Sequence, residues 1–189
     1  NPEWLAEFRQ IAMVCIGITG LRCSGPDDLT PILNALVTMQ ERADRFDGAL
    51  IRMSMSDKGP MAMIVFGLPD QAHDDDPIRA VRVAQEISIA LGDKGTPARC
   101  AVTFGPAYCG LIGNEERYAP GIIGDVTNRA AKSLELEGLP PVVCDEAIVQ
   151  RAGQRVDFAS VERTFADGSA MFCPLHYQPA PAGTTQTLS

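Results

Sequence analysis

Hydrophobic residues along the chain fall alternately into strand-length runs and into stretches with helical spacing. Residues 11–18 form a continuous apolar run, which predicts a buried strand. A helix is predicted to begin after Asp27, with Pro31 in its first turn, and to end before Asp47. Its apolar positions recur at spacings of three and four, and they are Leu29, Ile32, Leu33, Leu36, Val37 and Phe46.

The next stretch predicts a hairpin and a second helix. Residues 49–55 and 61–66 have strand composition, and a turn with Gly and Pro separates them. Asp76 is expected to cap the following helix, with Pro77 at its first position. We interpret the run 74–76 as a solvated helix N-terminus and not as a metal cluster. The buried stripe of this helix is predicted to be Ala80, Val83, Ala84, Ile87 and Leu91.

The second half of the chain continues this alternation in shorter elements. Strands are predicted at 98–104, 107–112, 141–144 and 170–176, and helices at 124–136 and 145–151. The first two of these strands would form a hairpin around Gly105 and Pro106. The order of all the elements implies an α+β fold with a ferredoxin-like βαββαβ core, in which helices cover one face of a mainly antiparallel sheet, followed by C-terminal αβ additions.

Composition narrows the classes of partner. The chain of 189 residues has the length of one domain, which we place at residues 1–177, with a disordered tail at 178–189. Its 16 basic and 24 acidic residues give a net charge of −8, which argues against nucleic acid or an anionic membrane as a partner. An aromatic content of 6% together with this charge also argues against an RNA-binding ferredoxin-like module. The absence of a signal peptide and the first residue, Asn1, suggest a segment of a longer, cytoplasmic protein.

The cysteines and histidines do not predict a metal site. The six cysteines never form C-x-x-C, and they are Cys15, Cys23, Cys100, Cys109, Cys144 and Cys173. Because several lie inside apolar runs, we interpret them as buried reduced thiols of a reducing compartment. The two histidines, His73 and His176, are too far apart in sequence to suggest a zinc site or a histidine-based triad.

The 17 glycines do not match a common phosphate loop. Gly105 and Gly110 have the spacing of a P-loop, but Leu111 follows where the P-loop has lysine. A G-x-G-x-x-G fingerprint after the first strand and a G-x-S-x-G nucleophile motif are both absent. Tight hairpin geometry is one explanation of these glycines.

A second explanation is a family resemblance. Residues 104–113 (FGPAYCGLIG) resemble the hairpin of class III nucleotide cyclases, G-x-x-x-x-G-x-x-G, and residues 123–132 (IGDVTNRAAK) are similar to the family's I-G-x-x-V-N-x-A-A-R. Residues 45–48 (RFDG) and 64–69 (IVFGLP) are similar to its Y-G-G and A-x-F-G-x-P signatures. The resemblance covers residues 8–178. It implies the family's fold and its activity, the cyclisation of ATP to cAMP and pyrophosphate at a site shared by two domains.

The resemblance implies metal ligands that this chain lacks. In the family, two aspartates hold the divalent ions, one in the first strand and one in the turn of the following hairpin. This chain has Gly17 at the first position and Ser56 at the second, with Asp57 one residue late. A one-residue offset in a strand or tight turn redirects the side chain. We therefore predict no metal site in this chain alone, and Mg²⁺ or Mn²⁺ only with a partner domain that supplies the ligands.

The resemblance also implies a substrate-binding set. The family's asparagine, which orients the ribose, is matched by Asn128, and the arginine that stabilises phosphate charge is matched by Lys132. These two catalytic candidates are four residues apart, so they share one face of a helix. Arg52 stands where the family has its purine-reading lysine, and Gly121 where it has Asp, Thr or Cys. For Arg52 and Lys132 an ordinary surface position remains the alternative, and for Asn128 an ordinary helical position without a functional role.

Two functions remain after this comparison. The first is the complementary half of a class III cyclase, resembling the second domain of soluble adenylyl cyclase-type tandem enzymes. It would bind ATP or GTP and act with a second cyclase domain, in the same polypeptide or as a homodimer. The second is a catalytically inactive dimerisation or nucleotide-sensing module that regulates an attached effector.

Overall fold

The computed structural model describes residues 7–21, 25, 29–56, 59–69, 71–113 and 118–177. The elements in chain order are β1 (Glu7–Ile18), α1 (Leu29–Arg45), β2 (Ala49–Ser56), β3 (Gly59–Phe66), α2 (Asp76–Asp93), β4 (Ala98–Gly113), β5 (Tyr118–Ile123), α3 (Asp125–Ser133), β6 (Val142–Asp145), α4 (Glu146–Ala152), β7 (Val156–Thr164) and β8 (Ala170–Tyr177). The predicted tail at 178–189 lies outside the described residues.

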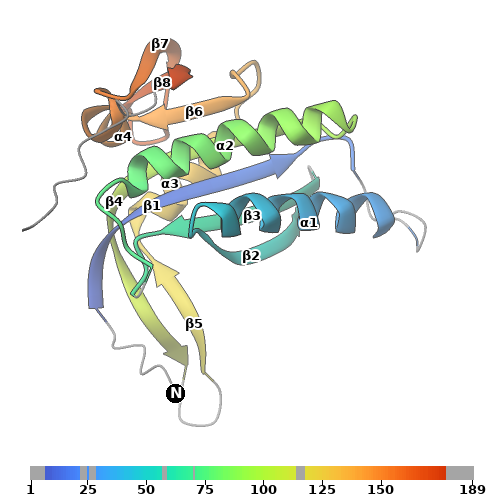
Figure 1. The fold of residues 1–189 in the computed structure, drawn as a ribbon, viewed down its shortest axis with the longest axis horizontal. Coiled ribbons are helices and arrows are strands. Elements are labelled where there is room, and N and C mark those ends of the chain that lie inside the picture. The colour runs from blue at the N-terminus through green and yellow to red at the C-terminus, as the bar shows by residue number, and fades with distance from the viewer. Residues whose placement is uncertain are drawn as a thin grey trace, which may run out of the picture.

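Within the described residues, the strands form one eight-stranded sheet (Figure 1). Its order is β2-β3-β1-β4-β6-β8-β7, with β5 paired to β4. The pairing of β4 with β6 is parallel, and the other pairings are antiparallel. The first six elements, β1 to β4 with α1 and α2, form the βαββαβ core that the sequence predicts. The fold class is therefore confirmed.

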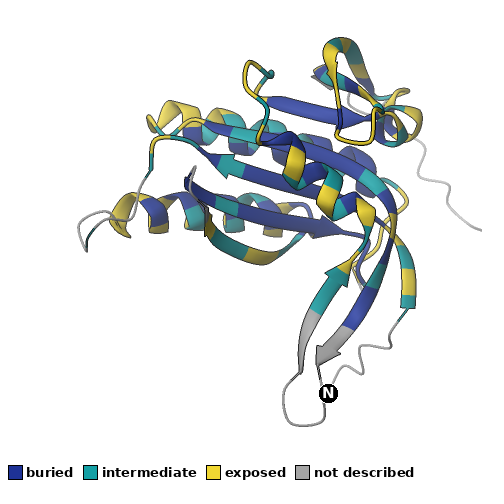
Figure 2. Cartoon of the chain, turned by 180° about the vertical axis from the view of Figure 1, so that it is seen from behind, coloured by how far each residue is buried: buried dark blue, intermediate teal, exposed yellow. Residues whose placement is uncertain are grey.

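Helices cover both faces of this sheet, whereas the sequence predicted one. The larger apolar cluster lies under α1, α2 and α4 and includes Met39, Ile64 and Ile87. The second cluster lies under α3 on the opposite face, where Met13 and Val143 pack against Val126. Figure 2 shows α3 in front of the sheet, in the view from behind. The central strand β1 is buried on both sides, which explains its continuous apolar run.

The buried face of α1 differs from the predicted one. Leu29, Leu33 and Val37 are exposed, although the pattern assigned them to the core. The buried positions of this helix are Ile32, Ala35, Thr38, Met39 and Ala43. Small residues allow a helix to pack closely against its neighbours, and a pattern that counts only large apolar residues misses them.

The start of α2 also differs from the prediction. The N-cap residue is Asp75, without a side-chain capping hydrogen bond, and Asp76 is already helical. Asp76 is buried, not solvated, and its Oδ2 accepts a hydrogen bond from the backbone N–H of His73 at 2.9 Å. This carboxylate therefore stabilises the loop that precedes the helix.

The predicted hairpin around Gly105 and Pro106 is wrong. Both residues lie inside β4, a single strand of 16 residues. On one edge β4 pairs with β1 throughout residues 98–109, and on the other edge it pairs with β6 only up to Val102 and with β5 only from Tyr108. Pro106 lies between these two partners, where a strand tolerates a residue without an N–H. The actual hairpin connects β4 to β5, and the far ends of these strands project as an arm (Figure 1).

Two strands, β5 and β7, were missed by the sequence analysis. Pro120 and Gly121 in β5 are turn-forming residues, and β7 carries mostly exposed and half-buried positions without a strong apolar run. The cysteine prediction is confirmed for the described part of the chain, where Cys15, Cys100, Cys109 and Cys144 are buried free thiols and Cys173 is a half-buried one. Among the described helices, none is both long and apolar enough to cross a membrane.

Candidate functional site

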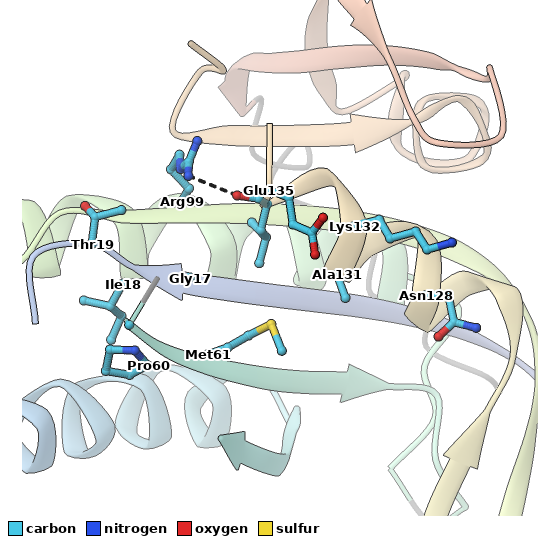
Figure 3. A pocket seen from close by; sticks show the side chains of 12 residues that line it. Gly17, Ile18, Thr19, Pro60, Met61, Arg99, Asn128, Ala131, Lys132 and Glu135 are labelled. Atoms are coloured by element: carbon cyan, nitrogen blue, oxygen red, sulfur yellow. Dashed lines mark hydrogen bonds between the residues drawn. The ribbon is translucent and has the colours of Figure 1, made fainter. Parts of the chain in front are cut away.

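A cavity of about 290 Å³ lies between α3 and the sheet. Its floor is formed where three strands meet, since Gly17 of β1 pairs with Met61 of β3 on one side and with Arg99 of β4 on the other. Its other wall is α3 and the turn after it. The lining residues are Gly17, Ile18, Thr19, Gly59, Pro60, Met61, Arg99, Asn128, Ala131, Lys132, Leu134 and Glu135 (Figure 3).

The structure brings Asn128 and Lys132 to this cavity together. In their helix α3, Val126 and Ala130 are buried against the sheet, and residues 128 and 132 lie at the cavity rim. Both side chains are exposed, and neither makes a hydrogen bond or an ion pair with another described residue. Two polar side chains are thus available to a ligand at one end of the cavity, as Figure 3 shows.

Three residues make polar contacts that hold α3 in place, namely Thr103 and Arg99 of β4 and Arg129 of α3 itself. The hydroxyl of Thr103 donates to the carbonyl of Val126 at 2.8 Å, near the start of the helix. The guanidinium of Arg99 donates to the carbonyls of Leu134 and Leu136, just beyond its end. Orphan carbonyls at a helix C-terminus need such partners. The third contact is the ion pair of Arg129 with Asp145 at 2.7 Å.

The first metal-ligand position faces an apolar side chain. A Cβ atom at Gly17 would lie 3.5 Å from Cδ1 of Leu134, at ordinary contact distance. Leu134 is itself buried. A side chain at residue 17 would therefore begin beside Leu134, on the floor of the cavity. The residues present here do not fit a divalent ion.

The second metal-ligand position is only partly described. The backbone of Ser56 pairs with Gly59, which lines the cavity, so the chain at residue 56 lies beside the site. Asp57 lies outside the described residues.

The two base-reading candidates are separate from the cavity. Arg52 pairs with Met63, which belongs to the cluster under α3, so it lies on the same face of the sheet as the cavity. Its side chain is exposed, and its strand β2 is separated by β3 from β1, which carries Gly17. Gly121 pairs with Gly110 on the β4–β5 arm. In the described structure neither residue lines the cavity.

Sequence reasoning missed several residues of this site. Arg99 and Met61 line the cavity but match no motif. The sequence did contain a signal for Arg99. It is the second residue of a predicted strand, and a charged side chain in a buried strand requires a partner. Its partners are carbonyls about 35 residues away along the chain, which no local pattern reveals.

The end of the cavity away from Asn128 is largely apolar, and the Thr19 hydroxyl there donates to the carbonyl of Pro97. Ile18, Thr19 and Pro60 lie at the end away from Asn128, and Met61 lies between the two ends (Figure 3). Burial raises the pKa of the Cys15 thiol, two residues before Gly17, to about 12, so this sulfur stays protonated. The charged groups at the rim are Arg99, Lys132 and Glu135, and the guanidinium of Arg99 is already bonded to carbonyls.

Comparison with solved structures decides the fold family. The adenylyl cyclase CyaB from P. aeruginosa superposes with a TM-score of 0.78 at 14% identity, over 92% of this chain and 97% of that one. The guanylate cyclase domain of RhGC from Catenaria anguillulae, in complex with GTP, superposes with a TM-score of 0.76 at 16% identity, over 92% and 100%. The fold is that of a class III nucleotide cyclase domain.

A curated relative agrees with this family resemblance. Human adenylate cyclase type 10 is 25% identical over 134 residues, which is 69% of this chain. The chain spans only 8% of the length of that relative. No protein-family model matches the chain. The resemblance inferred from the motifs is thus confirmed, and the cavity of this class III cyclase fold contains Asn128 and Lys132 but, at residue 17, no ligand for a metal.

Proposed function

We propose that this chain is the complementary half of a class III nucleotide cyclase, which converts ATP to cAMP and pyrophosphate together with a partner domain. The observation that supports this most directly is the placement of Asn128 and Lys132 at the rim of one cavity, with both side chains unpaired among the described residues. They are the positions at which the family resemblance implies ribose orientation and phosphate binding. A cavity of about 290 Å³ is small for a whole nucleoside triphosphate, which suits a site completed by a second domain.

Each residue has a distinct role in this proposal. The Asn128 amide can donate to and accept from ribose hydroxyl groups. The Lys132 ammonium places a positive charge near the phosphates, where negative charge develops as the α-phosphorus is attacked. Lysine provides a point charge without the bidentate geometry of arginine. The candidates for base recognition are Arg52 and Gly121, both outside the cavity, and because Gly121 has no side chain, ATP and GTP remain alternative substrates.

The proposal requires a partner for the metal ions. Mg²⁺ or Mn²⁺ would activate the ribose hydroxyl and bind phosphate oxygens, and its ligands would come from the partner domain, because Gly17 offers none and faces Leu134. The partner would be a second cyclase domain of the same cytoplasmic polypeptide or a second copy of this chain. The much greater length of the curated relative is compatible with the first arrangement.

A catalytically inactive regulatory module is the second candidate. The glycine at residue 17 favours it, because it supplies no side chain for one of the two metal-ligand positions that the family resemblance implies. Lysine at position 132, in place of the family's arginine, favours it as well. Such a module would still bind a cyclase partner, and it could still bind nucleotide.

The test is cyclic-nucleotide production from Mn²⁺-ATP. The chain alone is compared with the chain mixed with a metal-bearing cyclase domain whose own cation position is disabled. Product in the mixture only is the expected result. Association without product, shown by analytical ultracentrifugation of the same mixture, would favour the regulatory module.

A separate titration tests the missing metal site. Isothermal titration of the chain alone with Mn²⁺ and a non-cyclisable ATP analogue should show no tight binding of two ions. Two-ion binding by this chain alone would contradict the half-site proposal.

A further inference from the structure

Arg129 lies on α3 between the two candidate catalytic residues, but its side chain points away from the cavity. Its guanidinium forms an ion pair with Asp145 at 2.7 Å, and on the same side it reaches Asp167 at 3.5 Å. It also donates to the carbonyl of Phe104 at 3.4 Å. The two carboxylates come from the end of β6 and from the turn between β7 and β8. Arg129 therefore connects α3 to the C-terminal part of the fold.

Asp145 is an almost fully enclosed partner. It is 3% exposed, and each of its oxygens is engaged. Oδ1 accepts from the backbone N–H of Ile148, which caps α4, and Oδ2 accepts from the backbone N–H of Phe104 as well as from Arg129. Burial raises the pKa of Asp145, while these hydrogen bonds and the charge of Arg129 oppose the rise. The carboxylate thus joins β4, α4 and α3 at one point.

The ion pair between Arg129 and Asp145 restricts the rotation of α3, which apolar packing alone does not fix. The helix has nine residues and no side-chain cap at Gly124, so little of its own structure fixes its rotation. The buried Val126 and Ala130 define a face, but apolar contacts are non-directional. The Thr103 and Arg99 contacts hold the two ends of the helix at backbone carbonyls. Arg129 anchors the middle of the helix by a side chain, one residue after Asn128 and three before Lys132.

We infer that Arg129 is a positioning residue, which sets the rotation of α3 and so the places of Asn128 and Lys132 at the cavity rim. This inference rests on the proposed function. A displacement of about 1 Å at a reacting group can lower a rate by roughly a hundredfold. A rotation of α3 would move both candidate side chains together, while their chemical identity remained unchanged.

The experiment compares three variants in the reconstituted mixture with a metal-bearing domain. Arg129→Gln removes the charge and is expected to lower kcat about tenfold or more, with a change in KM for Mn²⁺-ATP of less than about threefold. Arg129→Lys keeps the charge and should recover part of kcat. Asp167→Ala is the matched control, because it removes the exposed partner and leaves the Asp145 pair intact, and its kcat should stay within about twofold of the unaltered chain.

A second readout does not depend on activity. The ¹⁵N amide signals of Asn128 and Lys132 should move in Arg129→Gln and stay close to their original positions in Asp167→Ala. An unchanged kcat in folded Arg129→Gln, or amide signals that do not move, would overturn the inference. If the unaltered chain forms no product with its partner, the half-site proposal fails, and the amide signals still decide whether Arg129 positions α3.

Discussion

The two faces of the sheet are built in different ways. On one face, α1 and α2 are helices of 17 and 18 residues that bury stripes of apolar side chains in the larger cluster. Polar contacts between them include the peripheral pairing of Arg42 and Arg45 with Glu86. On the other face, α3 has nine residues and is held by directional contacts from Arg99, Thr103 and Asp145.

The two faces therefore contribute to different properties. The face with α1 and α2 contributes mainly to stability, and the face with α3 mainly to the position of the candidate site. Large apolar stripes contribute free energy in proportion to buried area but define position only loosely. Buried hydrogen bonds and ion pairs contribute less net stability, yet they require particular geometries. The face with the candidate site is the one with the directional contacts. We therefore expect substitutions under α1 and α2 to change mainly folding, and substitutions around α3 to change mainly function.

The largest expected effect is on folding, in α2. Ile87 is fully buried, and Ile87→Ala should lower the free energy of unfolding by about 2–5 kcal/mol because it leaves a cavity. Urea denaturation measures this loss. Ile89, on the same helix, is 65% exposed, and Ile89→Ala should stay within about 0.5 kcal/mol of the unaltered chain. Equal losses for the two variants would contradict the assignment of the core to this face.

The next effect is on turnover, at α3. Lys132→Ala should lower kcat in the reconstituted mixture about ten- to a hundredfold, since a cation that stabilises developing charge is lost. The free energy of unfolding should hardly change, because the side chain is exposed and unpaired among the described residues. Arg163→Ala, which removes an exposed cation in β7, is the control for a general effect of charge. Unchanged turnover would return Lys132 to an ordinary surface position.

The sequence predicted the central fold because its strongest patterns are local. The continuous run of β1, the hairpin of β2 and β3, and the stripe of α2 each lie within one element. The errors arose where contacts between distant parts of the chain determine the local structure. Pro106 and Gly105 are turn-forming residues, but pairing with β1 keeps them in a strand.

The candidate site was predictable only in part. Asn128 and Lys132 could be found because a motif and a helical spacing indicate them. The closeness of residue 17 to Leu134, by contrast, brings β1 next to the end of α3, and the ion pair of Arg129 joins α3 to β6. Neither contact has a local pattern in the sequence, so the apolar metal position and the anchoring of α3 became visible only in three dimensions.

Two buried threonines, one bonded to α3 and one in α1, allow the two faces to be compared directly. Thr103→Val removes the buried hydroxyl that donates to Val126 of α3, at a cost of about 1 kcal/mol in unfolding free energy. Thr38→Val removes a buried hydroxyl of α1, which donates within its own helix to Asn34 and accepts from Lys94. The stability losses should be similar, but only Thr103→Val should also lower kcat. A fall in kcat for both would mean that directional contacts on the two faces affect the site alike.

The smallest expected effect is on stability, at the buried carboxylate of Asp76 in α2. Asp76 Oδ2 is bonded to the N–H of His73, but Oδ1 is buried and has no partner among the described residues. Burial raises the pKa of Asp76, and the His73 hydrogen bond and nearby positive charges only partly offset this. A carboxyl group with a raised folded-state pKa adds stability below its unfolded pKa, and this contribution is lost as the pH rises through the folded pKa.

Asp76→Asn should therefore be more stable than the unaltered chain at neutral pH, by less than about 1 kcal/mol, because the amide keeps an oxygen for the His73 N–H and carries no buried charge. The difference should shrink as the pH falls through the folded-state pKa of Asp76 toward its unfolded value of about 3.9, because the folded carboxyl group then takes up a proton and loses its buried charge. Urea denaturation at pH 7.5 and 4.5 measures it. A loss of stability at pH 7.5 would show that the Asp76 charge is stabilised by its surroundings, and that directional electrostatic contacts anchor α2 as they anchor α3.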